Sequence, residues 1–181
     1  SLGHGYKVGI VQFIKGGWHS GERTALEKFG DQVMIRCLGD GFTWETKNVE
    51  QDVIRVLDRR HKIVELEKLL STKDATRCII FVETKKEVEA LYEDLHAKGL
   101  QVAYLHGDKR QRERERTLRA FKEGVFNILI ATDVAARGID VKDVSHVINY
   151  TVPQTHDDYV HRIGRTGRGG KIGKAFTFVM M

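Results

Sequence analysis

The stretch Arg77-Cys78-Ile79-Ile80-Phe81-Val82-Glu83-Thr84 decides the fold class of this chain. Its apolar run is short and rich in Ile and Val, which is typical of a buried strand. Thr84 can cap a helix, and Glu87 stands three residues later at the reciprocal position of a capping box. The next apolar side chains recur at helical spacing until Gly99. The stretch therefore predicts a strand that leads directly into a helix, as in an α/β domain.

The same alternation continues along the chain. Short runs rich in Val and Ile predict strands at 8–14, 32–38, 77–82, 102–105, 126–131, 146–150 and 174–179. Helical spacing predicts helices at 21–29, 48–70, 85–98 and 109–123, the last of them capped by Asp108. We therefore expect a three-layer α/β domain with a mostly parallel sheet of about seven strands and helices on both faces.

The expected helix at 48–70 is unusual in its length and its charge. Asn48 would begin it, with Gln51 at the capping-box position. A helix of about 23 residues is twice the usual length, and the block Arg59-Arg60-His61-Lys62 interrupts its apolar positions. This block therefore indicates either a break in the helix or a join between two segments.

Composition and charge set limits on the class of protein. The chain has 181 residues, which suits a single domain over 1–181. A net charge of +5 permits a polyanionic partner. Cys37 and Cys78 both lie in apolar runs, which favours reduced core residues over a disulfide or a metal pair. No run is apolar for long enough to span a membrane and no signal peptide opens the chain, so we expect a reducing, cytoplasmic setting without a membrane partner.

The stretch His161-Arg162-Ile163-Gly164-Arg165-Thr166-Gly167-Arg168 holds three arginines and a histidine within eight residues, a grouping that folding alone does not require. Arg165 and Arg168 would point the same way if the preceding helix continued through them. Planar guanidinium groups suit phosphate, and the glycines let the backbone approach it closely. The alternative is a solvated basic turn. Thr84, His106-Gly107-Asp108 and Thr132-Asp133 each follow a predicted strand, at the sheet edge where such folds bind ligands.

From about Arg60 to the end, the chain resembles the C-terminal RecA-like domain of DEAD-box RNA helicases. The resemblance rests on ordered motifs: Ile79 to Thr84 (motif IV), His106-Gly107-Asp108 with Gln111 and Arg114 (the Gln-x-x-Arg motif), Ala131 to Asp140 (motif V) and Tyr159 to Arg168 (motif VI). Four motifs in the family's order form a specific signal, and they imply a P-loop-type, RecA-like fold.

The resemblance also implies roles for individual residues. The predicted RNA-binding residues are Thr84, Gly107, Gln111, Arg114 and Thr132. Gly107, Arg114 and Thr132 offer main-chain, guanidinium and hydroxyl donors that suit a single-stranded RNA backbone. Asp140 would accept from the ATP ribose, Arg165 and Arg168 would act as an arginine finger, and His161 would lie between two domains. The alternative for 111–122 is a solvated helix with charge pairs such as Glu115 and Arg119.

Residues of about 2–57 resemble a different family, the ATP:corrinoid adenosyltransferases. Gln12-Phe13-Ile14-Lys15-Gly16 and Gly41-Phe42-Thr43-Trp44 are distinctive strings that occur in that family's order. In that family the aromatic loop lies near the corrinoid. The alternative for Phe42 and Trp44 is a loop that folds back on the core.

Both resemblances lack the parts that would make an enzyme. The chain has no Gly-x-x-x-x-Gly-Lys-Ser/Thr phosphate loop and no Asp-Glu-Ala-Asp magnesium site. An arginine finger without a nucleotide cradle has no reaction to assist. We therefore expect no complete catalytic residue set, no metal site and no cofactor in the isolated chain. ATP and Mg²⁺ would bind only if a first RecA-like domain completed the site.

The interpretation favoured by these features is a chimera, joined in the laboratory from an adenosyltransferase-like segment (1–57) and a helicase-like segment (58–181). It would be a non-catalytic, recombinant scaffold that weakly binds single-stranded RNA or another phosphate polyanion. The first alternative is the C-terminal half of an ATP-dependent RNA helicase, working with a first RecA-like domain on another chain. The second is a variant corrinoid adenosyltransferase, which the missing phosphate loop disfavours.

Overall fold

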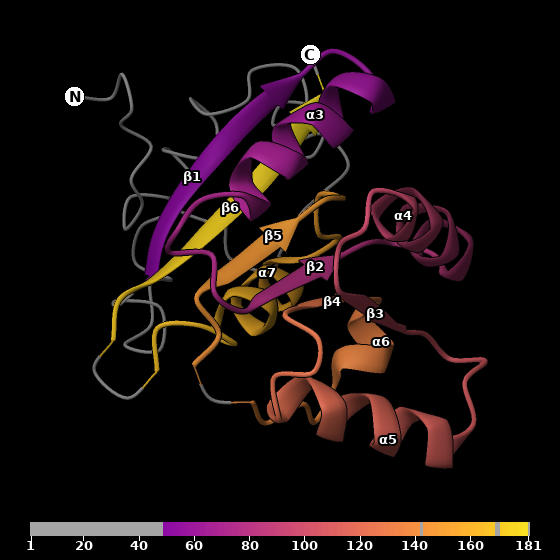
Figure 1. Ribbon diagram of the computed structural model, residues 1–181. Coiled ribbons are helices and arrows are strands. Elements are labelled where there is room, and N and C mark those ends of the chain that lie inside the picture. The colour runs from indigo at the N-terminus through magenta and orange to yellow at the C-terminus, as the bar shows by residue number, and fades with distance from the viewer. Residues whose placement is uncertain (1–48, 142, 169–170, 181) are drawn as a thin grey trace.

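In the computed structural model of the protein, which describes residues 49–141, 143–168 and 171–180, six parallel strands form one sheet (Figure 1). The strand order is β1-β6-β5-β2-β4-β3, and every neighbouring pair is parallel. In chain order the elements are β1 (Val49–Val56), α3 (Arg59–Leu70), β2 (Cys78–Phe81), α4 (Lys85–Ala97), β3 (Val102–Leu105), α5 (Gln111–Lys122), β4 (Ile128–Ala131), α6 (Asp133–Ala136), β5 (His146–Asn149), α7 (His156–Ile163) and β6 (Gly173–Met180). The predicted α/β class is confirmed.

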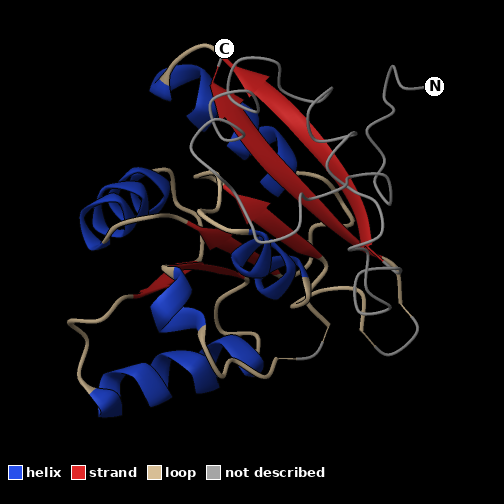
Figure 2. Ribbon diagram, turned by 180° about the vertical axis from the view of Figure 1, so that it is seen from behind, coloured by secondary structure: helices blue, strands red, loops and turns tan. Residues whose placement is uncertain are grey.

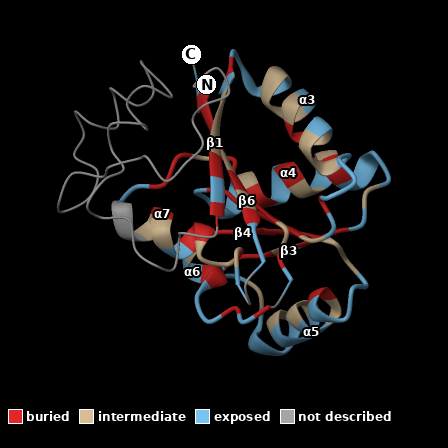
Figure 3. Ribbon diagram, turned by 90° about the vertical axis from the view of Figure 1, so that its left-hand side faces the viewer, coloured by how far each residue is buried: buried red, intermediate tan, exposed pale blue. Residues whose placement is uncertain are grey.

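Helices cover both faces of this sheet, so the strands are buried on both sides (Figures 2 and 3). Successive side chains of a strand point to opposite faces. Ile79 and Phe81 of β2 join the core under α5, α6 and α7, whereas Ile80 joins the core under α3 and α4. Both cores consist almost wholly of aliphatic and aromatic side chains. This double burial explains why β2, β4 and β5 read as continuous apolar runs.

The prediction of one helix over 48–70 is wrong. Val49–Val56 forms the edge strand β1 and pairs with β6 along its whole length, from Val49 opposite Gly173 to Val56 opposite Met180. Helix α3 begins only at Arg59, where the Asp58 side chain caps it by accepting from the main-chain N–H of His61 at 2.8 Å. The charged block that seemed to interrupt a long helix is therefore the first turn of a shorter one.

The other predicted elements divide into confirmed ones and ones outside the described residues. All five predicted strands after residue 76 form, and so do the helices between Thr84 and Gly99 and between Asp108 and Gly124. Cys78 is 1% exposed, and burial raises the pKa of its thiol to about 12, as expected for a reduced core residue. The strands predicted at 8–14 and 32–38, the helix at 21–29, Cys37 and the loop with Phe42 and Trp44 lie outside the described residues.

Candidate nucleic-acid and nucleotide interface

The candidate residues gather at one edge of the sheet because all strands run in the same direction. β2, β4 and β3 are neighbours, so the loops that follow them lie in one row. The Lys85 ammonium donates to the Asp108 carboxylate at 2.7 Å and links the first turn of α4, just after the β2 loop, to the loop after β3. The Arg114 guanidinium donates to the main-chain oxygen of Arg137 at 2.9 Å and links α5 to the loop after α6. The predicted gathering of polar groups at this edge is confirmed.

Thr84 stands where β2 leads into α4. Its hydroxyl oxygen accepts from the main-chain N–H of Glu87 at 3.1 Å and lies 3.4 Å from the Glu87 carboxylate. The predicted Thr84 cap of α4 therefore forms, with Glu87 bonded to the Thr84 hydroxyl, and Thr84 is exposed at the sheet edge. Because the hydroxyl caps the helix, an RNA contact by Thr84 would have to use the main chain or share this hydroxyl.

The loop after β3 is fixed by its histidine. The His106 ring is buried, and its Nδ1 accepts from the Asp108 main-chain N–H at 3.1 Å. Its Nε2 therefore carries the proton and donates to Glu89 at 3.0 Å. The next residue, Gly107, is exposed, and a Cβ there would come no closer than 4.0 Å to the Lys85 side chain. The loop thus presents open main chain to solvent.

The prediction that Asp108 caps the following helix is wrong. Arg110 is the N-cap residue of α5, and its side chain makes no capping hydrogen bond. The Asp108 carboxylate pairs with Lys85 instead, and the hydrogen bond from Lys85 lowers the pKa of Asp108 below its usual range. Asp108 therefore pairs with Lys85 of α4 instead of capping the helix that follows it in sequence.

Gln111 and Arg114 lie on the first turn of α5. The Gln111 amide donates to the Glu115 carboxylate at 3.0 Å on the exposed side of the helix. Arg114 is half-buried and uses one N–H on the Arg137 carbonyl, which leaves further guanidinium N–H groups for a ligand. These contacts hold the two residues in place without using all of their hydrogen-bonding capacity.

Thr132 differs from the other predicted RNA residues because it is buried, with 9% of its surface exposed. Its hydroxyl accepts from the main-chain N–H of Ala135 at 3.4 Å and caps the short helix α6. The predicted hydroxyl contact with RNA would therefore compete with a structural role.

Arg162 is a structural residue that the sequence analysis did not separate from its neighbours. It is 2% exposed and forms a two-point ion pair with Asp133, with N–O distances of 2.6 and 2.7 Å. It also donates to the main-chain oxygen of Thr151 at 2.7 Å, and its guanidinium lies 5.2 Å from the centre of the Phe81 ring. Its spacing from the buried Tyr159 and Ile163 on α7 was the signal that could have shown this inward position.

Arg165 and Arg168 do not continue the helix, because α7 ends at Ile163 with Gly164 as its C-cap residue. Gly167 then adopts a positive φ of 72°. Even so, the two arginines and Asp140 come together. Arg165 donates to the main-chain oxygen of Ile139 at 2.5 Å, and Arg168 lies 3.3 Å from the Asp140 carboxylate. Burial lowers the pKa of Arg165, and nearby Arg168 lowers it further.

The exposed face of this cluster is open to a ligand. The Asp140 side chain is 77% exposed and that of Arg168 is 47% exposed. His161 is exposed on the last turn of α7 and lines a small hollow together with Arg137, Arg162 and Arg165. The structure therefore brings together all residues that the sequence assigned to nucleotide binding, with His161 beside them.

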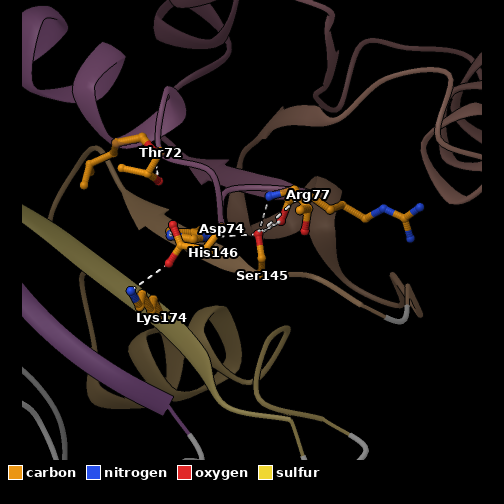
Figure 4. Close-up of polar contacts among 8 residues, drawn as sticks. Thr72, Asp74, Arg77, Ser145, His146 and Lys174 are labelled. Atoms are coloured by element: carbon orange, nitrogen blue, oxygen red, sulfur yellow. Dashed lines mark hydrogen bonds and ion pairs between the residues drawn. The ribbon is translucent and has the colours of Figure 1, made fainter.

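A second polar cluster lies at the opposite edge of the sheet, where β2, β5 and β6 begin (Figure 4). The Ser145 hydroxyl lies 2.9 Å from Nδ1 of His146, and Nε2 of His146 lies 3.9 Å from Asp74. The same hydroxyl accepts from the main-chain N–H groups of Thr76 and Arg77 and donates to the Arg77 carbonyl. A hydroxyl held by four groups is not free to act as a nucleophile, so this Ser-His-Asp arrangement joins strands rather than catalysing a reaction.

Within the described ranges 49–141, 143–168 and 171–180, no group of three His, Cys, Asp or Glu side chains is arranged to hold a metal ion. In these same ranges no helix is long and apolar enough to cross a membrane.

Comparisons with known proteins point to two families. Residues 61–170 match the family described as helicase conserved C-terminal domain. Residues 1–92 match the family described as ATP:corrinoid adenosyltransferase BtuR/CobO/CobP, and the two matches overlap over 61–92. The overlap covers most of α3, all of β2 and the first part of α4, which here form part of the same sheet domain as the remaining elements.

Individual relatives agree with the first family. The chain is 42% identical over 135 residues to the ATP-dependent RNA helicase SrmB of Haemophilus influenzae, covering 75% of this chain and 31% of that protein. It is 46% identical over 132 residues to the DEAD-box ATP-dependent RNA helicase CshA of Bacillus subtilis, covering 73% of this chain and 26% of that protein. The chain thus spans about a third or less of these relatives.

Solved structures give the same result for the fold. The crystal structure of E. coli DEAD-box protein SrmB bound to regulator of ribonuclease activity A matches with a TM-score of 0.68 and 44% identity, over 71% of this chain and 75% of that one. S. cerevisiae Dbp5 bound to RNA and ADP BeF3 matches with a TM-score of 0.66 and 33% identity, over 87% of this chain and 43% of that one. The fold is therefore the RecA-like fold of DEAD-box proteins.

Proposed function

Because the chain belongs to the helicase conserved C-terminal domain family, with its residues 1–92 also matching the ATP:corrinoid adenosyltransferase family, we propose that it acts as the second RecA-like domain of a DEAD-box RNA helicase. In this role it binds single-stranded RNA and supplies arginines to ATP held mainly by a first domain. This is the first alternative of the sequence analysis, and the comparisons support it better than the chimera that we favoured there.

The arrangement that carries this proposal is the row of loops after β2, β3 and β4. Gly107 offers open main chain, and Arg114 keeps guanidinium N–H groups in excess of its single bond to Arg137. Gln111 lies on the same first turn of α5. Such donors suit the sugar-phosphate backbone, which is the part of RNA that carries no sequence information. We therefore expect binding that tolerates many RNA sequences.

Arg165, Arg168 and Asp140 form the nucleotide side of the proposal. The exposed carboxylate of Asp140 can accept from a ribose hydroxyl, and the neighbouring guanidinium groups can neutralise charge on a transferring phosphoryl group. The partner for these groups is a first RecA-like domain that carries a phosphate loop and Mg²⁺. His161, exposed beside Arg165, would contact that domain or its nucleotide.

The RNA half of the proposal is tested by fluorescence anisotropy with a labelled single-stranded RNA over a range of salt concentrations. Arg114→Ala should weaken binding to all sequences alike and lower the slope of log affinity against log salt by about one unit. Arg116→Ala on the exposed side of the same helix is the matched control. Equal slopes for the two variants, or no binding at low salt, would show that α5 is only a solvated helix.

The nucleotide half is tested by adding a first RecA-like domain from a DEAD-box helicase to the chain and measuring RNA-stimulated ATP hydrolysis. We expect no stimulated hydrolysis by either component alone and hydrolysis when both are present. If the mixture stays inactive while RNA binding is intact, the chain is an RNA-binding module and not half of an ATPase.

The match of residues 1–92 supports a second candidate, a fusion of an adenosyltransferase-like segment to the helicase domain. In that case the isolated chain is a scaffold with residual RNA affinity. Adenosyl transfer to a reduced corrinoid, followed by the change in the corrinoid absorption spectrum, tests whether any of that family's activity remains. We expect none, because no phosphate loop is present in the sequence.

A further inference from the structure

A hollow between helices α3 and α4 lies away from the proposed RNA and nucleotide residues. Its volume is about 310 Å³, within the range of small-molecule sites. Leu91 of α4, Tyr150 after β5 and Met180 at the end of β6 form an apolar wall. Arg59, Lys62 and Glu87 line it as well. None of the residues assigned above to RNA or nucleotide borders it.

Tyr150 lines this hollow, and its hydroxyl is a buried donor that no described residue pairs with. Its side chain is 6% exposed, and its buried hydroxyl has no hydrogen-bond partner in the part of the chain that the structure describes. Burial raises the pKa of Tyr150 to about 12, so the hydroxyl keeps its proton at neutral pH. A buried hydroxyl without a partner is costly and uncommon in folded proteins.

Lys62 adds a cation whose charge is partly offset by the Glu87 carboxylate. Its ammonium lies 4.2 Å from the centre of the Tyr150 ring and forms no ion pair or side-chain hydrogen bond with a described residue. Desolvation lowers the pKa of Lys62 to about 8. The ammonium and the tyrosine hydroxyl thus belong to two side chains in direct contact, and both retain donor capacity.

The other charged groups at the hollow already have partners. Arg59 pairs with Asp94 at 2.5 Å. The Glu87 carboxylate accepts from the Thr151 hydroxyl at 3.0 Å and also takes part in the cap of α4. Among the described residues, the groups at this site that still lack a hydrogen-bond partner are donors. A ligand that pairs with them must therefore carry acceptor oxygens.

We propose that this hollow binds a small organic anion, in which a carboxylate accepts from Tyr150 and Lys62 while an apolar body covers Leu91 and Met180. The ammonium attracts the opposite charge of a carboxylate, which a neutral amide lacks, and this favours a carboxylate over an amide. The apolar wall and the nearby Glu87 carboxylate disfavour a polyanion such as the RNA backbone. The proposal does not depend on the proposed helicase function.

The test uses 3-phenylpropanoate and its neutral amide, titrated into the full chain at pH 7 while amide chemical shifts are recorded by NMR. A ligand of this size is expected to bind with a dissociation constant in the millimolar range. We expect 3-phenylpropanoate to bind about tenfold more tightly than 3-phenylpropanamide. Shifts should concentrate on α3, α4 and the residues around Tyr150.

Variants identify the donors. Tyr150→Phe keeps the ring and should weaken 3-phenylpropanoate several-fold, and Lys62→Gln should bring its affinity close to that of the amide. Lys68→Gln, at an exposed position of the same helix, is the matched control and should bind as the parent does. The folded state of each variant is read from the same spectra.

Three outcomes of the titrations themselves would overturn the proposal. They are equal affinity for the acid and the amide, unchanged affinity in both variants, and no shift at the hollow at about 50 mM ligand, well above the expected constant. Displacement of 3-phenylpropanoate by a single-stranded RNA would also overturn it, because the hollow would then be an extension of the RNA surface.

Discussion

The two edges of the sheet both carry dense polar clusters, and they differ in how much hydrogen-bonding capacity is left over. At the edge where the strands begin, Ser145 serves four partners, and Asp74 lies between Lys174 and His146 (Figure 4). At the edge where they end, Arg114 uses one bond and Asp140 is largely exposed. Residue type does not separate the two clusters. The edge that can bind a ligand is the one whose side chains still have hydrogen-bonding groups not used within the protein.

Arg162 is the exception at the functional edge, and its replacement should have the largest effect on stability. Arg162→Leu leaves Asp133 without its two-point partner and removes the bond to the Thr151 carbonyl. Loss of one partner of a buried pair typically costs about 3–5 kcal/mol, and Asp133 is 30% exposed, so we expect the lower end. Urea denaturation measures the change. Arg162→Lys keeps the charge without the fork and should be intermediate. A loss below about 1 kcal/mol would mean that water satisfies Asp133 and that Arg162 is not structural.

Ser145 tests the opposite edge. Ser145→Ala removes the acceptor of two main-chain N–H groups and the donor to the Arg77 carbonyl. Unmade bonds of this kind cost about 1–3 kcal/mol. We expect a lower urea midpoint with an unchanged m-value, and unchanged affinity for RNA. Ser71→Ala, which removes one exposed bond at the end of α3, is the control and should cost less than about 0.5 kcal/mol. A loss of RNA affinity in Ser145→Ala would break the separation between the two edges.

Local sequence was sufficient where a residue's partner lay within one turn, and insufficient where the partner came from elsewhere. The Thr84 cap of α4 was predictable because Thr84 and Glu87 are three residues apart. Asp108 had the right type and place for a cap, but its carboxylate pairs with Lys85 at the start of α4 instead. Arg162 could not be told from Arg168 by type, because its partners Asp133 and Thr151 meet it only in the folded sheet.

The segment Val49–Val56 shows the same limit for secondary structure. Its apolar residues fit helical spacing as well as strand alternation, since Val49, Val53, Ile54 and Val56 suit either pattern. Pairing with β6, more than one hundred residues away in sequence (Val49 opposite Gly173), decides for a strand. The α3–α4 hollow lay beyond sequence reasoning for this reason too, because Lys62 and Tyr150 are brought together only by tertiary packing.

His146 predicts how the edge where the strands begin responds to acid. Burial lowers the pKa of His146, so the folded state holds the ring neutral while the unfolded state protonates near pH 6.5. The stability due to the neutral ring is thus present above pH 6.5 and is lost as pH falls through the folded-state pKa. One such group changes stability by at most about 1.4 kcal/mol per pH unit. Urea midpoints between pH 7 and pH 5 should fall less steeply in His146→Gln. An unchanged slope would show that His146 is not responsible, and the exposed His161→Gln should not alter it.

Replacing Arg168 should change stability the least of these substitutions and change function strongly. It therefore gives the clearest contrast with the structural Arg162. Its side chain is 47% exposed and bonds only to the Gly164 carbonyl and to Asp140, so Arg168→Ala should alter stability by no more than about 0.5 kcal/mol. If the chain completes an ATPase with an added first domain, loss of an arginine finger should reduce stimulated hydrolysis by about 10³-fold or more. RNA affinity without nucleotide should stay as in the parent. A stability loss near that of Arg162→Leu would show that Arg168 is a structural arginine, and hydrolysis at the parental rate would show that it does not act on ATP. In either case, unused hydrogen-bonding capacity at this edge would not identify the residues that act on ATP.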